Sequence, residues 1–233
     1  MAKKNSKKNN ETSKLLMQMT GTDKVFYAVL DVFLVLSLII IAVPLWSTIT
    51  LSFRPNDFIG TNIEGMFLPP WEWSSAAYKA LLGNRGFTLA FANSLKILFF
   101  GVITALVLTI PIAYGLSINT LPGRKFFNIF ILIPYLFNIG LIPHYLVITK
   151  MGLSDHLAAV FLPVAVTTYN CLIMRSFFEG IPDSLKESAR IDGAPEWVVL
   201  VRIILPLSKP ILMTIGLFYG VSYWNDFFNA MLY

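Results

Sequence analysis

A charged stretch interrupts the apolar second half of this sequence, and its residue types limit the chemistry open to it. Residues 187–206 read ESARIDGAPEWVVLVRIILP and lie between two strongly apolar runs. Acidic and basic side chains are interspersed with apolar ones, and Gly193, Pro195 and Pro206 divide the stretch. This arrangement suits docking in a groove of another protein, where apolar side chains give contact and charges fix the register.

Turn-forming residues in this stretch predict two short helices. Pro182 and the polar residues after it start a first helix that runs to about Ile191. Gly193 can take the positive φ that ends this helix. Pro195 is preset for the first turn of a second helix, and Pro206 marks the end or a kink of that helix.

The two helices would form a bracket with an apolar contact surface that charged side chains surround. The apolar residues predicted for this surface are Leu185, Ala189, Trp197 and Val201. The charged residues around them are Glu187, Arg190, Asp192 and Glu196.

A second group of side chains with binding chemistry lies inside the apolar runs. Amides and aromatic rings can hydrogen-bond to hydroxyl groups and stack on sugar rings. The residues of this kind that we predict to line a substrate pathway are Asn138, Asn170, Tyr223, Trp224 and Asn225. Hydrogen bonding between helices explains Asn138 and Asn170 equally well. An aromatic belt at the membrane interface likewise explains Trp224.

The composition places these residues in a lipid bilayer. Of 233 residues, 56% are hydrophobic and 13% are charged, and the mean hydropathy of +0.67 is outside the soluble range. A helical span needs about 20 apolar residues, and lipid cannot satisfy open backbone groups. We therefore predict an all-α, polytopic membrane protein with five helical spans. These lie near residues 25–51, 90–118, 126–148, 157–178 and 210–233.

The distribution of basic residues predicts the orientation. A polar, lysine-rich leader, residues 1–24, precedes the first run and is typical of a cytoplasmic anchor. The basic loops after the second and fourth runs are then also cytoplasmic, as the positive-inside rule expects. Five spans from a cytoplasmic N terminus leave Tyr233 outside, and we expect a sixth span to be missing from this sequence.

Two segments are expected to differ from simple spans. The third run contains Gly140 and Pro143, and its tail, Pro143–Met151, either completes the span or forms a short helix on the outer surface. The loop 52–89 is rich in Pro, Gly and Trp. This composition suits ordered structure at the membrane surface, where the loop can contact an extracytoplasmic partner.

The charged stretch resembles the EAA loop of ABC importer permeases, E-A-A-x3-G-x9-I-x-L-P. The residues that match at this spacing are Glu187, Ala189, Gly193, Ile203, Leu205 and Pro206. Ser188 replaces the second alanine, a small-for-small change that still permits close helix packing. Flanking segments such as GLIPHYLV, IMRSFFEGIP, LPLSKPIL and LFYGVSYWNDFFNAMLY resemble the second permease subunit of the carbohydrate-uptake, maltose-transporter type. The resemblance covers residues 25–233 and is strongest to permeases for oligosaccharides or polysaccharide fragments.

This resemblance implies a six-helix transmembrane domain over residues 25–233, with five spans present and an ATPase-coupling loop at 180–209. The chain would be a transport subunit and not an enzyme, in the bacterial cytoplasmic membrane with a cytoplasmic N terminus. Its partners would be a second homologous permease, two ATPase subunits and an extracytoplasmic sugar-binding protein. ATP and Mg would be bound by the ATPase subunits, and this chain would hold no cofactor. The residues assigned to coupling are Glu187, Ser188, Ala189, Asp192, Gly193, Leu205 and Pro206.

Other functional classes fit the residues less well. An ion-coupled secondary transporter of a small polar solute, the main alternative, needs paired carboxylates at membrane depth, and Asp31 and Asp226 have no obvious partners. An intramembrane hydrolase would have His144 as its sole membrane histidine, without a G-x-S-x-G motif. No phosphate-binding loop G-x-x-x-x-G-K-[ST] occurs, so energy must come from a partner. Cys171 stands alone, so no metal site is predicted, and the basic leader lacks the aromatic residues that would favour a nucleic-acid partner.

Overall fold

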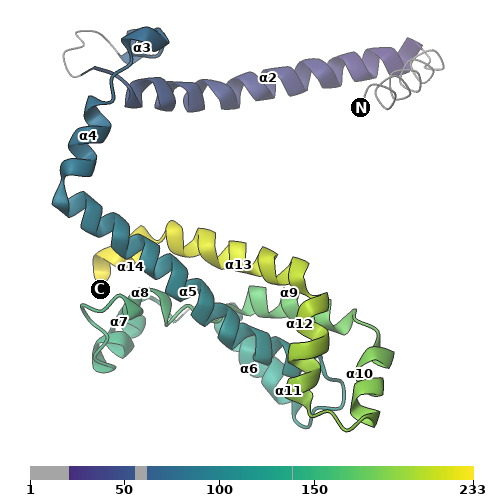
Figure 1. Ribbon diagram of the computed structural model, residues 1–233. Coiled ribbons are helices and arrows are strands. Elements are labelled where there is room, and N and C mark those ends of the chain that lie inside the picture. Colours follow the sequence, from purple (N-terminus) through teal and green to yellow (C-terminus); the bar gives the residue numbers. More distant parts are fainter. Residues whose placement is uncertain (1–20, 56–61, 138) are drawn as a thin grey trace. The chain divides into compact units, whose positions relative to one another are not determined.

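The computed structural model describes residues 21–55, 62–137 and 139–233, and the regular elements in these ranges are helices (Figure 1). The predicted all-α fold class is therefore confirmed. The chain divides into two compact units, residues 1–85 and 86–233. Most of the predicted leader, residues 1–20, lies outside the described ranges.

The first unit begins with a long apolar helix, α2 (Gly21–Ser52). At about 1.5 Å per residue this helix is longer than a hydrocarbon core of about 30 Å. Its large apolar side chains are mostly exposed, as expected of a span that faces lipid. The first predicted span is therefore a single helix, with Pro44 in its interior.

The segment after α2 folds back against the end of that helix. Its elements are α3 (Asn62–Gly65), the 3-10 turn η1 (Pro70–Glu72) and α4 (Ala76–Gly83). Trp73 stacks on Phe53 with ring centroids 5.1 Å apart, and the indole N–H of Trp46 donates to the carbonyl of Met66 at 3.0 Å. The described part of the predicted outer loop thus has defined structure, as expected from its composition.

The second unit is built around α5 (Arg85–Ser117), a single helix of 33 residues that matches the second predicted span. The helices that follow are α6 (Arg124–Leu136), α7 (Leu141–Lys150), α8 (Ala158–Phe161), α9 (Thr168–Glu179), α10 (Asp183–Ile191), α11 (Glu196–Val199), the π-helical turn η2 (Leu200–Ile204), α12 (Leu205–Leu207), α13 (Lys209–Trp224) and α14 (Phe227–Leu232).

The expectation that all five apolar runs are helical throughout is wrong for the last three. The third run bends by 116° between α6 and α7, so its tail forms a separate short helix, one of the two predicted alternatives. The fourth run is interrupted between α8 and α9, and the fifth between α13 and α14. Among the described helices, α2 and α5 are each long and apolar enough to cross a membrane, and counting each bent pair as one span raises the number to four.

A buried tyrosine satisfies the backbone at one of these interruptions. The hydroxyl of Tyr219 on α13 accepts the backbone N–H of Thr167, just before α9, at 3.1 Å. The same hydroxyl lies 2.9 Å from Oγ1 of Thr109 on α5. Breaks at membrane depth are tolerated where the protein supplies such partners. Tyr219 therefore joins three segments of the chain at one atom.

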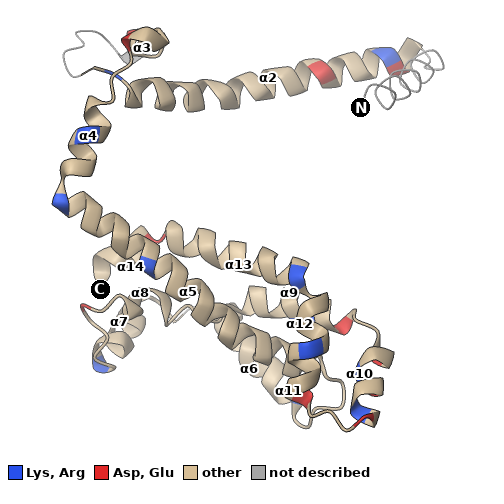
Figure 2. Cartoon of the chain, viewed as in Figure 1, with Lys and Arg blue, Asp and Glu red and all other residues tan. Residues whose placement is uncertain are grey.

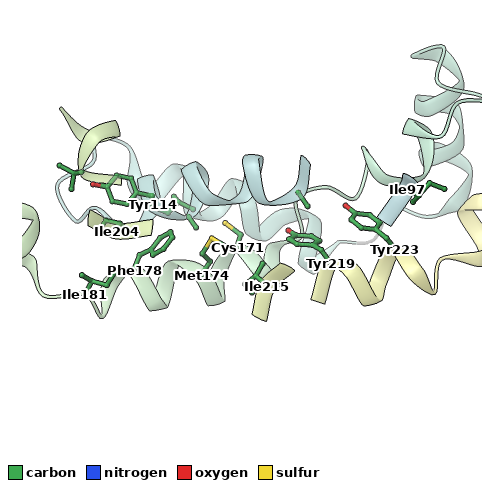
Figure 3. Close-up of a cluster of buried hydrophobic side chains, with 14 of the residues drawn as sticks. Ile97, Tyr114, Cys171, Met174, Phe178, Ile181, Ile204, Ile215, Tyr219 and Tyr223 are labelled. Atoms are coloured by element: carbon green, nitrogen blue, oxygen red, sulfur yellow. The ribbon is translucent and has the colours of Figure 1, made fainter. Parts of the chain in front are cut away.

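The core of the second unit is a row of buried side chains along α5, α9 and α13 (Figure 3). Tyr114 and Ile204 lie at one end of this row, and Tyr223 lies toward the other (Figure 3). Gly101 permits the close approach of α5 to α13, because a Cβ built there would lie 2.8 Å from the ring of Tyr223. Small residues serve this purpose in membranes, where packing and interhelical hydrogen bonds hold helices together.

Candidate functional site

The first arm of the bracket is α10, and Gly193 sets its end. The φ of Gly193 is +78°, a conformation that glycine adopts without the steric cost of a Cβ. Its N–H donates to the carbonyl of Arg190 at 3.0 Å, and the N–H of Ala194 donates to the carbonyl of Ala189 at 3.0 Å. These two bonds form a Schellman motif, which satisfies the last carbonyls of a helix. The predicted helix end and the positive φ are both confirmed.

The second arm consists of α11, η2 and α12, which follow one another without a gap. Pro195 has an extended conformation (φ −69°, ψ 155°) and stands directly before this arm instead of within its first turn. The chain then bends by 85° between Leu207 and Lys209, and Ser208 is fully buried there. The kink predicted at Pro206 is therefore present, two residues further along the chain.

An ion pair closes the bracket. Nε of Arg190 lies 2.7 Å from Oε1 of Glu196, and the hydroxyl of Tyr114 on α5 donates to the other oxygen of Glu196 at 2.6 Å. The hydrogen bond from Arg190 lowers the pKa of the Glu196 carboxyl, and the same bond raises the pKa of the Arg190 guanidinium. Both groups are charged at neutral pH, so they hold the two arms to each other and to α5.

Lys186 is buried at the base of α10, although its sequence neighbours are exposed. Its ammonium donates to the carbonyl of Phe178 at 3.2 Å and to the carboxylate of Asp183 at 3.0 Å. Lysine is seldom buried unless it is paired in this way. The polar hollow beside it, of about 110 Å³, is lined by Ser117, Ile118, Asn119, Thr120, Asp183, Lys186, Glu187 and Arg190.

The outer face of the bracket presents large apolar side chains that no other part of the described chain covers. Ile191 is 85% exposed and Trp197 is 66% exposed, and Leu185 and Val201 are exposed as well. Ala189 was predicted on this surface, but it is half-buried and packs against the core of the unit, whereas Ile191 was missed. Acidic and basic residues also occur along α10 and at α11 (Figure 2). Exposed apolar patches with a polar rim are typical of protein interaction sites.

The other residues assigned to coupling lie at both ends of the bracket. Glu187 and Asp192 are exposed on and after α10. The hydroxyl of Ser188 donates to a backbone carbonyl of its own helix at 3.2 Å. Leu205 is half-buried and Pro206 is exposed close to the 85° bend.

A second charged cluster ties α6 to α9. Glu179 on α9 pairs with Arg124 of α6 and with Arg175, the latter at 2.9 Å. Arg175 also donates to the amide oxygen of Asn128 at 2.6 Å. The i,i+4 spacing of Arg175 and Glu179 signals their pairing. The contributions of Arg124 and Asn128 come from a different helix, and no sequence pattern predicts them.

A groove of about 620 Å³ runs between α9 and α13. Asn170, one of the predicted pathway residues, lies on its wall and is buried. Tyr169 and Phe218 line the same groove with their rings tilted, 6.5 Å apart, and Ser222 lies one turn beyond Phe218. Sequence reasoning missed these three residues. The i,i+4 spacing of Phe218 and Ser222 was the available signal, because it places both on one face of a helix.

Three other predicted pathway residues that the structure describes, Tyr223, Trp224 and Asn225, do not line this groove. Tyr223 is buried, and its hydroxyl donates to a backbone carbonyl at 3.3 Å. Trp224 is 51% exposed, and the amide of Asn225 donates to a carbonyl one turn earlier at 2.8 Å. Asn138 lies outside the described residues. Of the four predicted pathway residues that the structure describes, Asn170 is the one that lies in the groove.

Residues 86–230, more than half of the chain, match the family described as binding-protein-dependent transport system inner membrane component. The chain belongs to this family. The predicted resemblance to ABC importer permeases is thereby confirmed. The description of this family, an inner membrane component of a transport system, agrees with the predicted membrane location and transport role.

Two relatives in this family come from Bacillus subtilis (strain 168). Protein LplC is 40% identical over 170 residues, which cover 73% of this chain and 58% of LplC. The polygalacturonan/rhamnogalacturonan transport system permease protein YtcP is 34% identical over 201 residues, which cover 86% of this chain and 70% of YtcP. The matched part of this chain therefore spans 58% to 70% of the length of these two relatives.

A solved structure of a family-type transporter has the same fold. One chain in the crystal structure of a bacterial ABC transporter involved in the import of the acidic polysaccharide alginate matches with a TM-score of 0.84 and 31% identity. The match covers 92% of this chain and 76% of that chain. At this identity the likeness supports common ancestry as well as a common fold.

Proposed function

We propose that this chain is a permease subunit of an ATP-driven ABC importer for an oligosaccharide or polysaccharide fragment. It would form the transport pathway with a second, homologous permease. Two ATPase subunits would supply energy from the cytoplasm, and an extracytoplasmic sugar-binding protein would deliver the substrate. The single observation that carries the proposal is the closed bracket of α10 to α12 with its exposed apolar face.

The bracket has the properties of a rigid docking element. The Schellman bonds at Gly193 fix its turn, and the ion pair of Arg190 with Glu196 holds its two arms together. The hydrogen bond from the hydroxyl of Tyr114 to Glu196 attaches the bracket to α5. An element fixed in this way loses little conformational entropy on binding. Ile191 and Trp197 then supply apolar anchors for a groove in an ATPase subunit.

The residues assigned to coupling take distinct roles in this proposal. Glu187 and Asp192 are exposed charges that would set the register of docking. Gly193 shapes the turn, and Ser188 and Ala189 are small enough to let α10 lie close to its neighbours. Leu205 and Pro206 stand beside the bend that leads into α13.

The substrate class is proposed from the groove and from the relatives together. Aromatic rings, an amide and a hydroxyl from Tyr169, Phe218, Asn170 and Ser222 line the groove, and these groups suit stacking on sugar rings and hydrogen bonding to hydroxyls. YtcP is named for polygalacturonan and rhamnogalacturonan transport, and the structural neighbour belongs to an alginate importer. Asn138, Tyr223, Trp224 and Asn225 remain proposed contacts elsewhere along the pathway.

The proposed location is the bacterial cytoplasmic membrane, with the N terminus and the bracket on the cytoplasmic side. ATP and Mg would be held by the ATPase subunits. The lysine-rich leader supports this orientation through the positive-inside rule.

Transport by the reconstituted complex tests the proposal. Vesicles that contain the two permeases, the ATPase subunits and the binding protein should accumulate labelled oligogalacturonides only when ATP is supplied to the ATPase side. Vesicles without the ATPase subunits, under an imposed proton or sodium gradient, should accumulate none. Uptake driven by the gradient alone would instead establish the ion-coupled alternative.

A further inference from the structure

The segment that follows α2 carries an apolar face of its own. Ile63, Phe67 and Trp71 are spaced four residues apart, and their side chains are 70%, 77% and 83% exposed. Leu68, between them in the chain, is 7% exposed and belongs to the inner side. Residues 63–73, called here the fold-back segment, therefore combine a buried leucine with three highly exposed large apolar side chains, which are called here its apolar face.

Contacts to α2 fix where this segment lies along the helix. The indole N–H of Trp46 reaches the carbonyl of Met66 at 3.0 Å, and the ring of Trp73 stacks on Phe53 just beyond the end of α2. Tyr78 on α4 adds a hydrogen bond from its hydroxyl to Oγ of a serine in the last turn, at 2.8 Å. The fold-back segment is thus held beside the last two turns of α2.

The charge pattern of α2 gives the depth of those turns in a membrane. After Asp31 the helix carries no charged residue as far as Ser52, a rise of about 30 Å that equals the thickness of the hydrocarbon core. When Asp31 lies at one headgroup level, the last two turns reach the opposite boundary. The fold-back segment lies at that boundary with them.

Several backbone groups of this segment are hydrogen-bonded within the protein. The N–H groups of residues 66, 67, 72 and 73 donate to carbonyls within the segment, and its two prolines have no N–H to donate. The carbonyls of Met66 and Leu68 accept from the indoles of Trp46 and Trp73, each at 3.0 Å. Segments in contact with lipid need such pairing, because hydrocarbon offers no hydrogen-bond partners.

We propose that the fold-back segment is an interfacial anchor that inserts Ile63, Phe67 and Trp71 into the lipid leaflet at the C-terminal end of α2. Phospholipid acyl chains would cover the apolar face, while Glu64 and Glu72 remain at headgroup level. Tryptophan and other large apolar side chains favour this boundary. The anchor would hold the end of α2 at a fixed depth.

Site-directed spin labelling of the full chain in phosphatidylethanolamine and phosphatidylglycerol vesicles tests this proposal. Nitroxides are attached to Phe67→Cys and Trp71→Cys in a Cys171→Ala background, since Cys171 is the only native cysteine. Glu72→Cys in the same segment and Trp197→Cys on the bracket serve as exposed controls. Collisions with O₂, which enters lipid, and with a nickel chelate, which stays in water, are measured at each position.

The expected ratio of O₂ to nickel accessibility is several-fold higher at positions 67 and 71 than at 72 and 197. Nickel accessibility at 67 and 71 equal to that at 197 would overturn the proposal, because the face would then lie in water. Exclusion of both reagents at 67 and 71 would also overturn it, because protein would then cover the face. Folding of each variant is checked by the near-ultraviolet signal of the Trp73 and Phe53 stack. The measurement requires no transport, so it stands apart from the proposed importer function.

Discussion

The bracket and the groove are built in opposite ways. The bonds that shape the turn of the bracket join residues close in sequence, between Ala189 and Glu196. The groove lies between α9 and α13, which are separated in the chain by the whole bracket and are brought together by the hydroxyl of Tyr219. The difference indicates that the part that docks a partner is specified locally, whereas the part that meets substrate depends on packing over the whole second unit.

The largest expected effect comes from a substitution in the turn of the bracket. Gly193→Val forces a β-branched residue into a left-handed conformation, at a cost of at least roughly 1–2 kcal/mol. ATP-driven uptake should fall about tenfold or more, with the loss arising in subunit assembly or coupling. Gly83→Ala is the control, because no atom lies within 4 Å of a Cβ built there and its φ is not positive. Normal uptake by Gly193→Val in intact complexes would contradict the proposed role of the bracket in coupling.

A substitution at Gly101 should disturb the packing of α5 against α13 and leave the bracket unchanged. A Cβ at Gly101 meets the buried ring of Tyr223 at 2.8 Å, whereas a Cβ at Gly216 meets its nearest side-chain atom at 3.6 Å. Gly101→Ala should therefore destabilise the protein by about 1–3 kcal/mol, and Gly216→Ala should be close to neutral. Thermal unfolding of the two variants in detergent measures the difference. Equal melting temperatures would show that α5 and α13 are not held as closely as described.

A substitution in the groove between α9 and α13 should change the affinity for substrate and leave coupling to ATP hydrolysis intact. Tyr169→Ala removes an aromatic face worth about 0.5–1.5 kcal/mol in a stacking contact, so the KM for transport should rise several-fold. Basal ATP hydrolysis and assembly should stay unchanged, in contrast to Gly193→Val. Val221→Ala, on the groove wall without a polar or aromatic group, is the matched control. A KM that is the same for both variants would argue against sugar contact at this groove.

The smallest effect is expected at the ion pair of the bracket. The pKa of Glu196 is lowered in the folded protein by the hydrogen bond from Arg190, so its stabilising contribution is present above the unfolded pKa of about 4.3 and is lost as pH falls through the lower folded pKa. Both side chains are more than one third exposed, and screening limits the contribution to about 0.2–1 kcal/mol. A double-mutant cycle of Glu196→Gln and Arg190→Gln, followed by thermal unfolding at pH 7 and at a pH well below the lowered folded pKa of Glu196, measures this contribution. A coupling that persists at the lower pH would contradict the assigned charge on Glu196.

Local signals in the sequence predicted the bracket well. Gly193, Pro195 and Pro206 each act on the backbone within one turn, so their spacing alone gave the end of α10, the start of the second arm and the position of the bend to within two residues. The lengths of the first two apolar runs predicted α2 and α5, because a long uninterrupted apolar run is stable in lipid as a helix.

Features that depend on distant residues were not predictable from the sequence. The break in the fourth run is stabilised by a partner elsewhere in the chain, since the hydroxyl of Tyr219 accepts the backbone N–H of Thr167. The burial of Lys186 and the inward position of Ala189 likewise follow from packing against the core. Asn170 was identified by its residue type. The i,i+4 spacing of Phe218 and Ser222 places both on one face of a helix, but that spacing does not show that this face meets α9 in a groove.

The bend at Ser208 has a mechanical consequence. Ser208 is the single residue between α12 and α13, and it is fully buried. A connection this short and this tightly packed cannot change its conformation freely when one helix moves. We therefore expect a displacement of α12 to tilt α13. The rim of the groove on α13 would then open or narrow in step with a movement that begins outside the bilayer.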